Sequence, residues 1–181
     1  KFDPLRNSDS RTVSGTLRFD PAALIKGSVS LGYRDFKPAA ADLPGYKGSV
    51  VAANVSYVLL GMTRLAFDVG RDVQYSYDVN QPYYVQTGMG GSISQQLFGP
   101  LDVVVRGGRR RLEYRDRVGA VVPVAERVDH VETYGAGIGY HLGRDTRIGV
   151  NVDRSRRDSA VSARRYSGWT YGVAVTYASG S

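Results

Sequence analysis

Residues 169–177 read WTYGVAVTY, and their side chains alternate between large and small. Every second residue from Trp169 to Tyr177 is large and apolar, whereas the residues between them are Thr, Gly, Ala and Thr. A period of two predicts a β-strand with one apolar face and one slim face. Strands of about 9–11 residues, apolar on the outside and small or polar on the inside, form the walls of transmembrane β-barrels.

The same alternation recurs along the whole chain, and no stretch of comparable length shows helical spacing. It predicts about nine strands joined in an antiparallel, up-and-down order, which is an all-β fold. The predicted strands cover residues 12–20, 26–34, 51–59, 65–75, 85–94, 101–106, 133–142, 147–153 and 169–177. Arg71 is a misfit, because it falls on the apolar side of its strand.

Length and composition limit the class of protein. The chain has 181 residues, so we expect residues 1–181 to form a single domain. It contains no run of about 18 apolar residues, which excludes a transmembrane helix but not a barrel, whose strands alternate. It has no cysteine, which excludes a disulfide framework and a thiolate metal site. No signal peptide is visible, so we expect either a mature chain or a piece of a longer protein.

The connections between the predicted strands alternate in length. Tight turns are predicted at residues 21–23, 60–62, 98–100 and 143–145. Longer polar links are predicted at residues 37–46, 78–82, 116–127 and 159–165. Short turns at one end and long loops at the other are typical of outer-membrane barrels, with the long loops outside the cell.

Aromatic residues gather near both ends of the predicted strands. Rings with a polar group prefer the membrane–water boundary, so we interpret these residues as a membrane girdle. The alternative is that tyrosine is simply common in strands. The candidate girdle residues are Phe19, Tyr33, Tyr57, Tyr75, Tyr140, Trp169 and Tyr177.

The end of the chain resembles the C-terminal signature of outer-membrane barrels. Thr170, Gly172, Val175 and Tyr177 match its order of polar residue, glycine, apolar residue and aromatic residue at the same spacing. The resemblance implies that the barrel assembly machinery reads this strand during biogenesis. Chains with this signature usually end at the aromatic residue, whereas four residues follow Tyr177 here.

Longer segments resemble the β-barrel porins of Gram-negative outer membranes. These segments are residues 72–78 (DVQYSYD), 81–88 (QPYYVQTG), 95–103 (QQLFGPLDV) and 134–145 (YGAGIGYHLGRD). The resemblance implies a bacterial outer-membrane barrel that acts as a passive porin-like conduit or surface scaffold. Some similar proteins are linked to exopolysaccharide export.

Two features predict that the chain is the C-terminal part of a larger barrel. Closed bacterial barrels have an even number of strands, whereas nine are predicted here. Similar proteins are also usually longer. We further expect residues 1–10 to lie in an outer loop.

Charged residues on the slim faces are candidates for lining a lumen. Paired with one another they would hold the interior together, whereas unpaired arginines would attract small anionic solutes. The candidate lumen-lining residues are Arg18, Arg34, Asp68, Asp72, Asp102, Arg106, Arg147 and Asp153.

The net charge of +7 is compatible with nucleic acid, anionic lipid or an acidic polymer as partner. We expect outward arginines such as Arg154 and Arg156 to meet phosphates of lipopolysaccharide, alongside other outer-membrane lipid. Nucleic acid is not expected as a partner, because the basic residues alternate with apolar ones instead of forming one basic face with stacking aromatics.

The sequence offers little for catalysis, and we predict neither an enzyme nor a cofactor. His130 and His141 are the only histidines, and their spacing does not suit a metal site. The Gly-rich stretches lie within predicted strands, which is not the context of a phosphate-binding loop. Gly107 and Gly108 are interpreted as a possible bulge, which would turn Leu112 and Tyr114 outward and leave Arg109, Arg111 and Glu113 inward.

A second interpretation of the same pattern is a secreted or soluble β-sheet module that binds carbohydrate through its tyrosines. The two hypotheses differ in where the apolar faces point. A membrane barrel directs them outward to lipid, whereas a soluble module packs them into a closed core.

Overall fold

The computed structural model describes residues 7–19, 24–143 and 145–177, and within them the chain forms nine strands and one short 3-10 turn. The strands are longer than the alternation predicted, at 12 to 15 residues each. They are β1 (Ser8–Phe19), β2 (Ile25–Pro38), β3 (Tyr46–Leu59), β4 (Thr63–Tyr75), β5 (Tyr83–Gln96), β6 (Leu101–Arg115), β7 (Val128–Leu142), β8 (Thr146–Asp158) and β9 (Tyr166–Tyr177), with η2 (Ser162–Arg164) before the last strand. The described part holds no helix that could cross a membrane.

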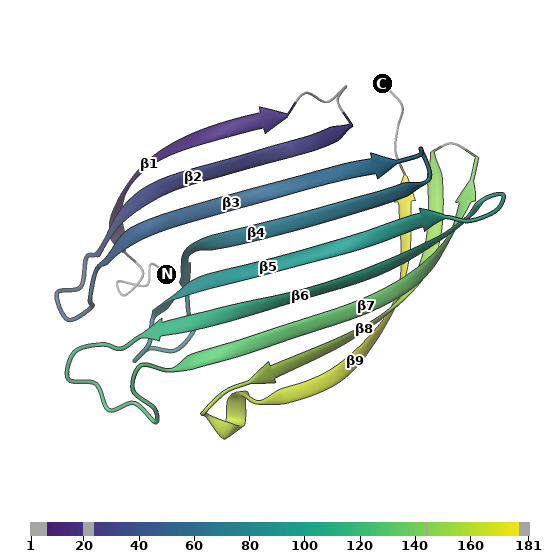
Figure 1. Cartoon of the computed structure of the whole chain (residues 1–181). Coiled ribbons are helices and arrows are strands. Elements are labelled where there is room, and N and C mark those ends of the chain that lie inside the picture. Colours follow the sequence, from purple (N-terminus) through teal and green to yellow (C-terminus); the bar gives the residue numbers. More distant parts are fainter. Residues whose placement is uncertain (1–6, 20–23, 144, 178–181) are drawn as a thin grey trace.

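All nine strands belong to one sheet, in which each strand pairs only with its neighbours in sequence. Every pairing is antiparallel, so the predicted up-and-down order is confirmed. The sheet is strongly curved, with β1 and β9 at its two edges (Figure 1). The described residues show no pairing that closes the sheet between those edges.

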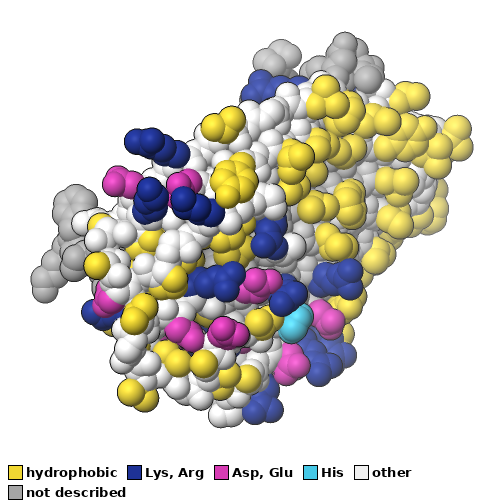
Figure 2. Space-filling view, turned by 60° about the vertical axis from the view of Figure 1, so that its left-hand side comes forward, with side chains coloured by type: hydrophobic (Ala, Val, Ile, Leu, Met, Phe, Trp, Pro, Cys, Tyr) yellow, Lys and Arg dark blue, Asp and Glu magenta, His cyan; other side chains and the backbone are white. Residues whose placement is uncertain are grey.

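The two faces of the sheet differ as the alternation predicted. Large apolar side chains stand exposed on one face: Val173, Val175 and Val150 are 74%, 67% and 57% accessible. Figure 2 shows hydrophobic side chains gathered in a broad band and charged side chains gathered away from it. The described part of the chain has no second sheet to cover this band, so these residues do not form the closed core that a soluble module would need.

Loop length separates the two ends of the sheet (Figure 1). Leu59 and Thr63 are joined by a tight turn in which Leu60 and Gly61 both have positive φ. At the other end β6 and β7 are separated by residues 116–127. The predicted turn at residues 21–23, the last residue of the predicted strand 12–20 and residue 144 of the predicted turn at residues 143–145 lie outside the described residues. Residues 8–10 belong to β1, not to the expected outer loop, and residues 1–6 are also outside the described part.

The prediction of a bulge at Gly107 and Gly108 is wrong. Both glycines keep continuous register, opposite Gly91 and Gly90 on β5 and opposite Tyr134 and Thr133 on β7. The alternation therefore runs through them unchanged. Leu112 and Tyr114 lie on the face that carries Asp102 and are 6% and 5% accessible, and Arg109, Arg111 and Glu113 lie on the opposite, outward face.

The outward orientation predicted for Val73, Tyr75 and Val85 is also wrong. Pairing between β3 and β4 ends at Val51 and Arg71, although β4 continues to pair with β5 up to Tyr75 and Tyr83. The end of β4 turns away from β3 (Figure 1). Val73 and Val85 are buried in a cluster whose members are Phe36, Tyr46, Val73, Tyr83 and Val85.

Phe36 and Tyr46 lie on the face of β2 and β3 that is opposite the exposed apolar face. The end of the β4–β5 hairpin therefore packs against that opposite, charged face. The ring of Phe36 packs edge-on against Tyr83 at 5.2 Å between centroids. Burying this apolar cluster compensates for the ladder hydrogen bonds that β3 and β4 do not form beyond Arg71.

Candidate functional site: a charged concave face closed by long loops

Ion pairs that cross an intervening strand mark the charged face as the concave side of the sheet. Arg106 on β6 and Asp153 on β8 lie in one row with Gly135 of β7 between them. The guanidinium of Arg106 donates from Nε to Asp153 Oδ1 at 2.8 Å and from Nη2 to Oδ2 at 2.5 Å. A Cβ atom at Gly135 would overlap this pair, so only glycine leaves room for it.

A second pair crosses β7 nearer to the short turns. Arg147 donates to both carboxylate oxygens of Asp102, at 2.7 Å from Nε and 2.5 Å from Nη2. His141 Nε2 lies 2.7 Å from Asp102 Oδ2. A Cβ at Gly139 would collide with the Arg147 guanidinium, so this pair also uses the space above a glycine. Bidentate pairs of this kind fix both side chains.

The remaining candidate lumen residues are placed on the same face. Arg34 donates from Nη1 to Asp72 Oδ1 at 2.7 Å, across β3. The Asp68 carboxylate lies over Gly90, whose added Cβ would be 2.7 Å from Oδ1. Arg18 pairs in register with Ser28 near the short-turn end. The concave face therefore brings together three arginine–aspartate pairs, and Asp68 and Arg18 stand outside them.

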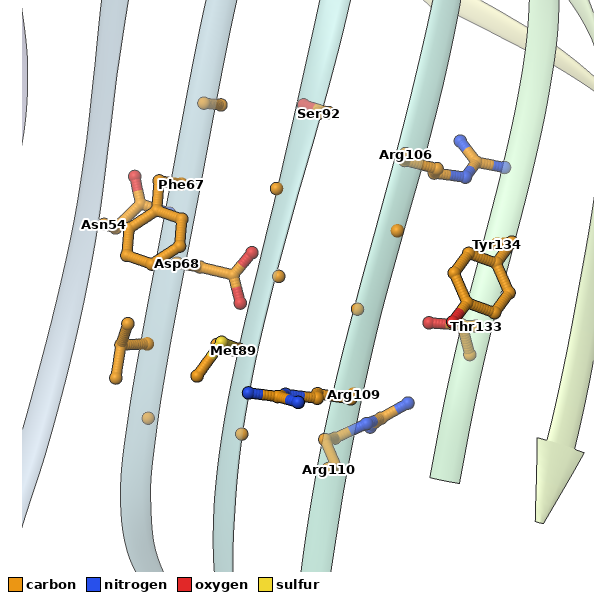
Figure 3. Close-up of a pocket in the computed structure, with 18 of the residues that line it drawn as sticks. Asn54, Phe67, Asp68, Met89, Ser92, Arg106, Arg109, Arg110, Thr133 and Tyr134 are labelled. Carbon is orange, nitrogen blue, oxygen red and sulfur yellow. The ribbon is translucent and has the colours of Figure 1, made fainter. Parts of the chain in front are cut away.

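The pairs have a direct electrostatic consequence. Three of the four candidate arginines each face a carboxylate within hydrogen-bond distance, so each pair carries no net charge. This arrangement matches the first alternative predicted from the sequence, in which paired charges hold the interior together. It does not match the second, in which unpaired arginines attract small anionic solutes. Beside the Arg106 pair lies a depression of about 530 Å³, whose lining includes Gly88, Gly90 and Gly108. The side chains of Asn54, Asp68 and Arg110 also line it (Figure 3).

The long loops are tied to one another above this face. Arg117 pairs with Asp42, which joins the loop after β6 to the loop after β2. Asp78, in the loop after β4, lies 3.6 Å from Arg127 and 3.9 Å from Arg164. The buried side chain of Gln81 donates to Asp116 Oδ1 at 2.5 Å and to the Val124 carbonyl. All four loops are thus linked by polar contacts.

A buried charged centre anchors the long loops to the sheet. Only the polar character of the loops could have indicated it from the sequence. Asp129 is fully buried and accepts hydrogen bonds from Arg157 Nε and Nη2 at 3.0 and 2.6 Å. The guanidinium of Arg127, 2% exposed, stacks 3.6 Å above the Tyr114 ring. Arg157 also donates to the Tyr114 hydroxyl at 2.7 Å.

The candidate girdle residues lie mostly on the apolar face. Tyr33, Tyr140, Trp169 and Tyr177 are 56%, 48%, 59% and 70% exposed. Tyr57 and Phe19 have the same outward register. Tyr75 differs, because its hydroxyl is hydrogen-bonded to Ser8 Oγ at 2.6 Å and its ring contacts Phe36.

The candidate assembly residues all lie on β9, an edge strand. Val175 and Tyr177 are on its apolar face, and Thr170 and Gly172 are on its concave face. Residues 178–181 lie outside the described part. Within the described residues, no group of three or more His, Cys, Asp and Glu side chains is placed to hold a metal ion.

Comparison with curated proteins and with solved structures gives no match. One protein-family comparison does match, and it covers almost the whole chain. The family described as "Putative beta-barrel porin 2" matches residues 2–179, and the curved antiparallel sheet with its apolar outer face fits a porin wall. The chain therefore belongs to this family of β-barrel porins.

Proposed function

We propose that this sheet is part of the wall of an outer-membrane β-barrel and that the barrel is a passive conduit for small solutes or a surface scaffold. The observation that carries the proposal is the exposed apolar face combined with a concave face of ion pairs. Lipid covers the first, and water reaches the second. The function needs no catalytic group, and we assign none.

Strand direction indicates how the barrel closes. β1 and β9 both run from the long-loop end to the short-turn end, so direct pairing between them would be parallel. We infer that an antiparallel ring needs an odd number of additional strands, from elsewhere in the protein or from another subunit. A structure of the full-length protein with β1 paired directly to β9 would contradict this.

We expect the paired arginines to make the conduit weakly selective, with opposite changes in two variants. Asp153→Asn leaves Arg106 without its carboxylate and should favour anions, whereas Arg106→Gln leaves Asp153 and should favour cations. One unit charge ~4 Å from a passing ion in water changes its energy by ~1 kcal/mol, or about fivefold in permeability ratio. Reversal potential in a planar bilayer under a KCl gradient measures this ratio.

The double variant Asp153→Asn, Arg106→Gln is the matched control, because it removes both charges and should return selectivity to that of the parent. A change of the permeability ratio in the same direction in both single variants would contradict a lumen position for the pair. If the parent inserts into the bilayer without conducting, the scaffold role is favoured.

Polysaccharide export is a second candidate function, and one observation favours it. The depression beside Arg106 offers amide and hydroxyl groups from Asn54, Gln86, Ser92 and Thr133, which suit sugar hydroxyls. Swelling of proteoliposomes in isosmotic oligosaccharide tests it. Swelling with small ions but not with oligosaccharides would contradict polysaccharide export and would be consistent with a conduit for small solutes only.

A further inference from the structure

The outward face carries a shallow apolar groove whose floor is made of glycine. Gly91 on β5 pairs with Gly107 on β6, so no side chain rises between the flanking strands. A cavity of about 310 Å³ lies there, lined by Phe67, Met89, Arg109 and Tyr134 together with these glycines. Figure 3 shows these four side chains on four successive strands. Phe67 and Tyr134 are 51% and 58% exposed.

The rings border the groove closely. A Cβ added at Gly107 would lie 3.4 Å from Tyr134 Cδ1, and one added at Gly91 would lie 3.9 Å from Phe67 Cδ2. The groove is therefore a slot between two aromatic side chains with backbone beneath it. Its apolar lining and narrow shape suit an acyl chain lying against the barrel wall.

Guanidinium groups stand at the long-loop end of this groove. Arg109 is the next residue after Gly107 on the outward face of β6. It pairs in register with Glu132 on β7, which pairs in turn with Arg156 on β8, so these three residues form one row across the strands. Arg154 lies in the neighbouring row beside Tyr134 and stacks 5.5 Å from the Trp169 ring. Within the described part of the chain, no ion pair joins Arg109, Arg154 or Arg156 to a carboxylate.

The position of these groups along the barrel axis matches a lipid headgroup. On the outward face of the described strands, every Lys, Arg, Asp and Glu lies in the half toward the long loops. The half toward the short turns presents residues such as Leu65, Tyr140 and Tyr177 instead. The apolar band thus ends at a row of aromatic residues with free guanidiniums directly beyond it, which is where lipid phosphates lie.

We propose that this groove and the arginines beyond it bind one acylated, phosphate-bearing lipid of the outer leaflet, of the lipid A type. An acyl chain lies in the slot over Gly91 and Gly107, and a phosphate accepts hydrogen bonds from Arg109. Arg156 is two strands away, about 10 Å, so it reaches a second phosphate on the same headgroup. This site rests on the proposed membrane location and adds a specific ligand to it.

The test measures binding of bisphosphorylated lipid A to the full-length protein in detergent micelles by native mass spectrometry. Arg109→Gln with Arg156→Gln removes two charged donors and should weaken binding at least about tenfold. Gly107→Val fills the slot where a Cβ makes only ordinary contact, and it should weaken binding about tenfold as well. Lys37→Gln with Lys47→Gln, outward residues beside Asp35, is the matched control and should change binding less than about twofold.

Glu132→Gln provides a test that misfolding cannot imitate. Glu132 lies in register between Arg109 and Arg156, where its charge repels a phosphate, so its removal should tighten binding severalfold. Weaker or unchanged binding in this variant would overturn the proposal. So would binding of dephosphorylated lipid A as strongly as the parent lipid.

Inorganic phosphate separates a lipid site from a simple anion site. If phosphate alone competes with lipid A at equal concentration, the groove contributes nothing and the lipid assignment is overturned. Bilayer conductance of the same variants should equal that of the parent, because all the substitutions face outward. A parent that binds lipid A but never inserts would count against the conduit proposal while leaving the lipid site supported.

Discussion

Replacing Asp129 with Asn should lower the free energy of unfolding by about 3–5 kcal/mol, because it removes the buried carboxylate that accepts two hydrogen bonds from the partly buried Arg157 and lies 3.5 Å from the buried Arg127. Asp129 is fully buried, and Arg127 is 2% exposed. The amide of Asn keeps the shape but not the charge. The measurement is urea-induced unfolding in detergent, followed by the emission of Trp169, the single tryptophan in the chain.

Asp158→Asn is the matched control for this prediction. Asp158 is exposed at the end of β8 and pairs in register with His130, so its loss should cost less than about 1 kcal/mol. Equal effects of the two substitutions would show that the long loops do not depend on the buried centre. A large effect confined to Asp129 would identify the centre as the main anchor of the long loops.

Val150→Arg should destabilise the protein in lipid vesicles by about 2–4 kcal/mol, because it places a charge in the middle of the apolar outer face. Val150 pairs with Ile138 and Val173, which are 55% and 74% exposed on the same face. The neighbouring substitution Asn151→Arg points to the concave face and should cost less than about 1 kcal/mol, since a charged side chain there stays in water.

Equilibrium unfolding of both variants in phospholipid vesicles, again followed by Trp169, gives the two free energies. The contrast between adjacent residues separates a membrane effect from a general loss of strand stability. If Asn151→Arg is the more damaging change, the apolar face does not meet lipid.

Alternation predicted the apolar, outward-facing part of most strands well and the full length of the strands poorly. Residues 169–177 form most of β9, but β6 was predicted to end at Arg106 and continues to Arg115. The apolar alternation of β6 is confined to Leu101, Val103 and Val105. Beyond it the strand continues with Arg109, Arg111 and Glu113, whose backbone pairs equally well although their side chains give no apolar signal.

The charged face was predictable as a set of residues but not as a set of pairs. Arg106 and Asp153 are 47 residues apart in sequence and two strands apart in space, so their contact depends on the strand register. One signal in the sequence could have indicated it. Gly135 and Gly139 leave open positions on β7, and long side chains from β6 and β8 can meet only over such positions.

The fold of the β4–β5 end could not be predicted from local pattern. Val73 and Val85 alternate with polar residues in the same way as the exposed apolar residues of the other strands, yet they are 7% and 0% exposed. Their burial depends on Phe36 and Tyr46, which come from the concave face of β2 and β3. A long-range contact of this kind overrides the period of two without leaving a local trace.

The accessibility of single cysteines along β9 measures directly whether the apolar face of the sheet meets lipid. Residues 1–181 contain no cysteine, so each substitution adds one labelling site to them. A nitroxide at residues 173, 174, 175 and 176 of the full-length protein in lipid vesicles is probed with oxygen, which partitions into lipid, and with a water-soluble nickel chelate. We predict oxygen access at Val173 and Val175 and nickel access at Ala174 and Thr176. Equal access at all four positions, or protection of Val173 and Val175 from both reagents, would contradict a membrane-facing apolar surface.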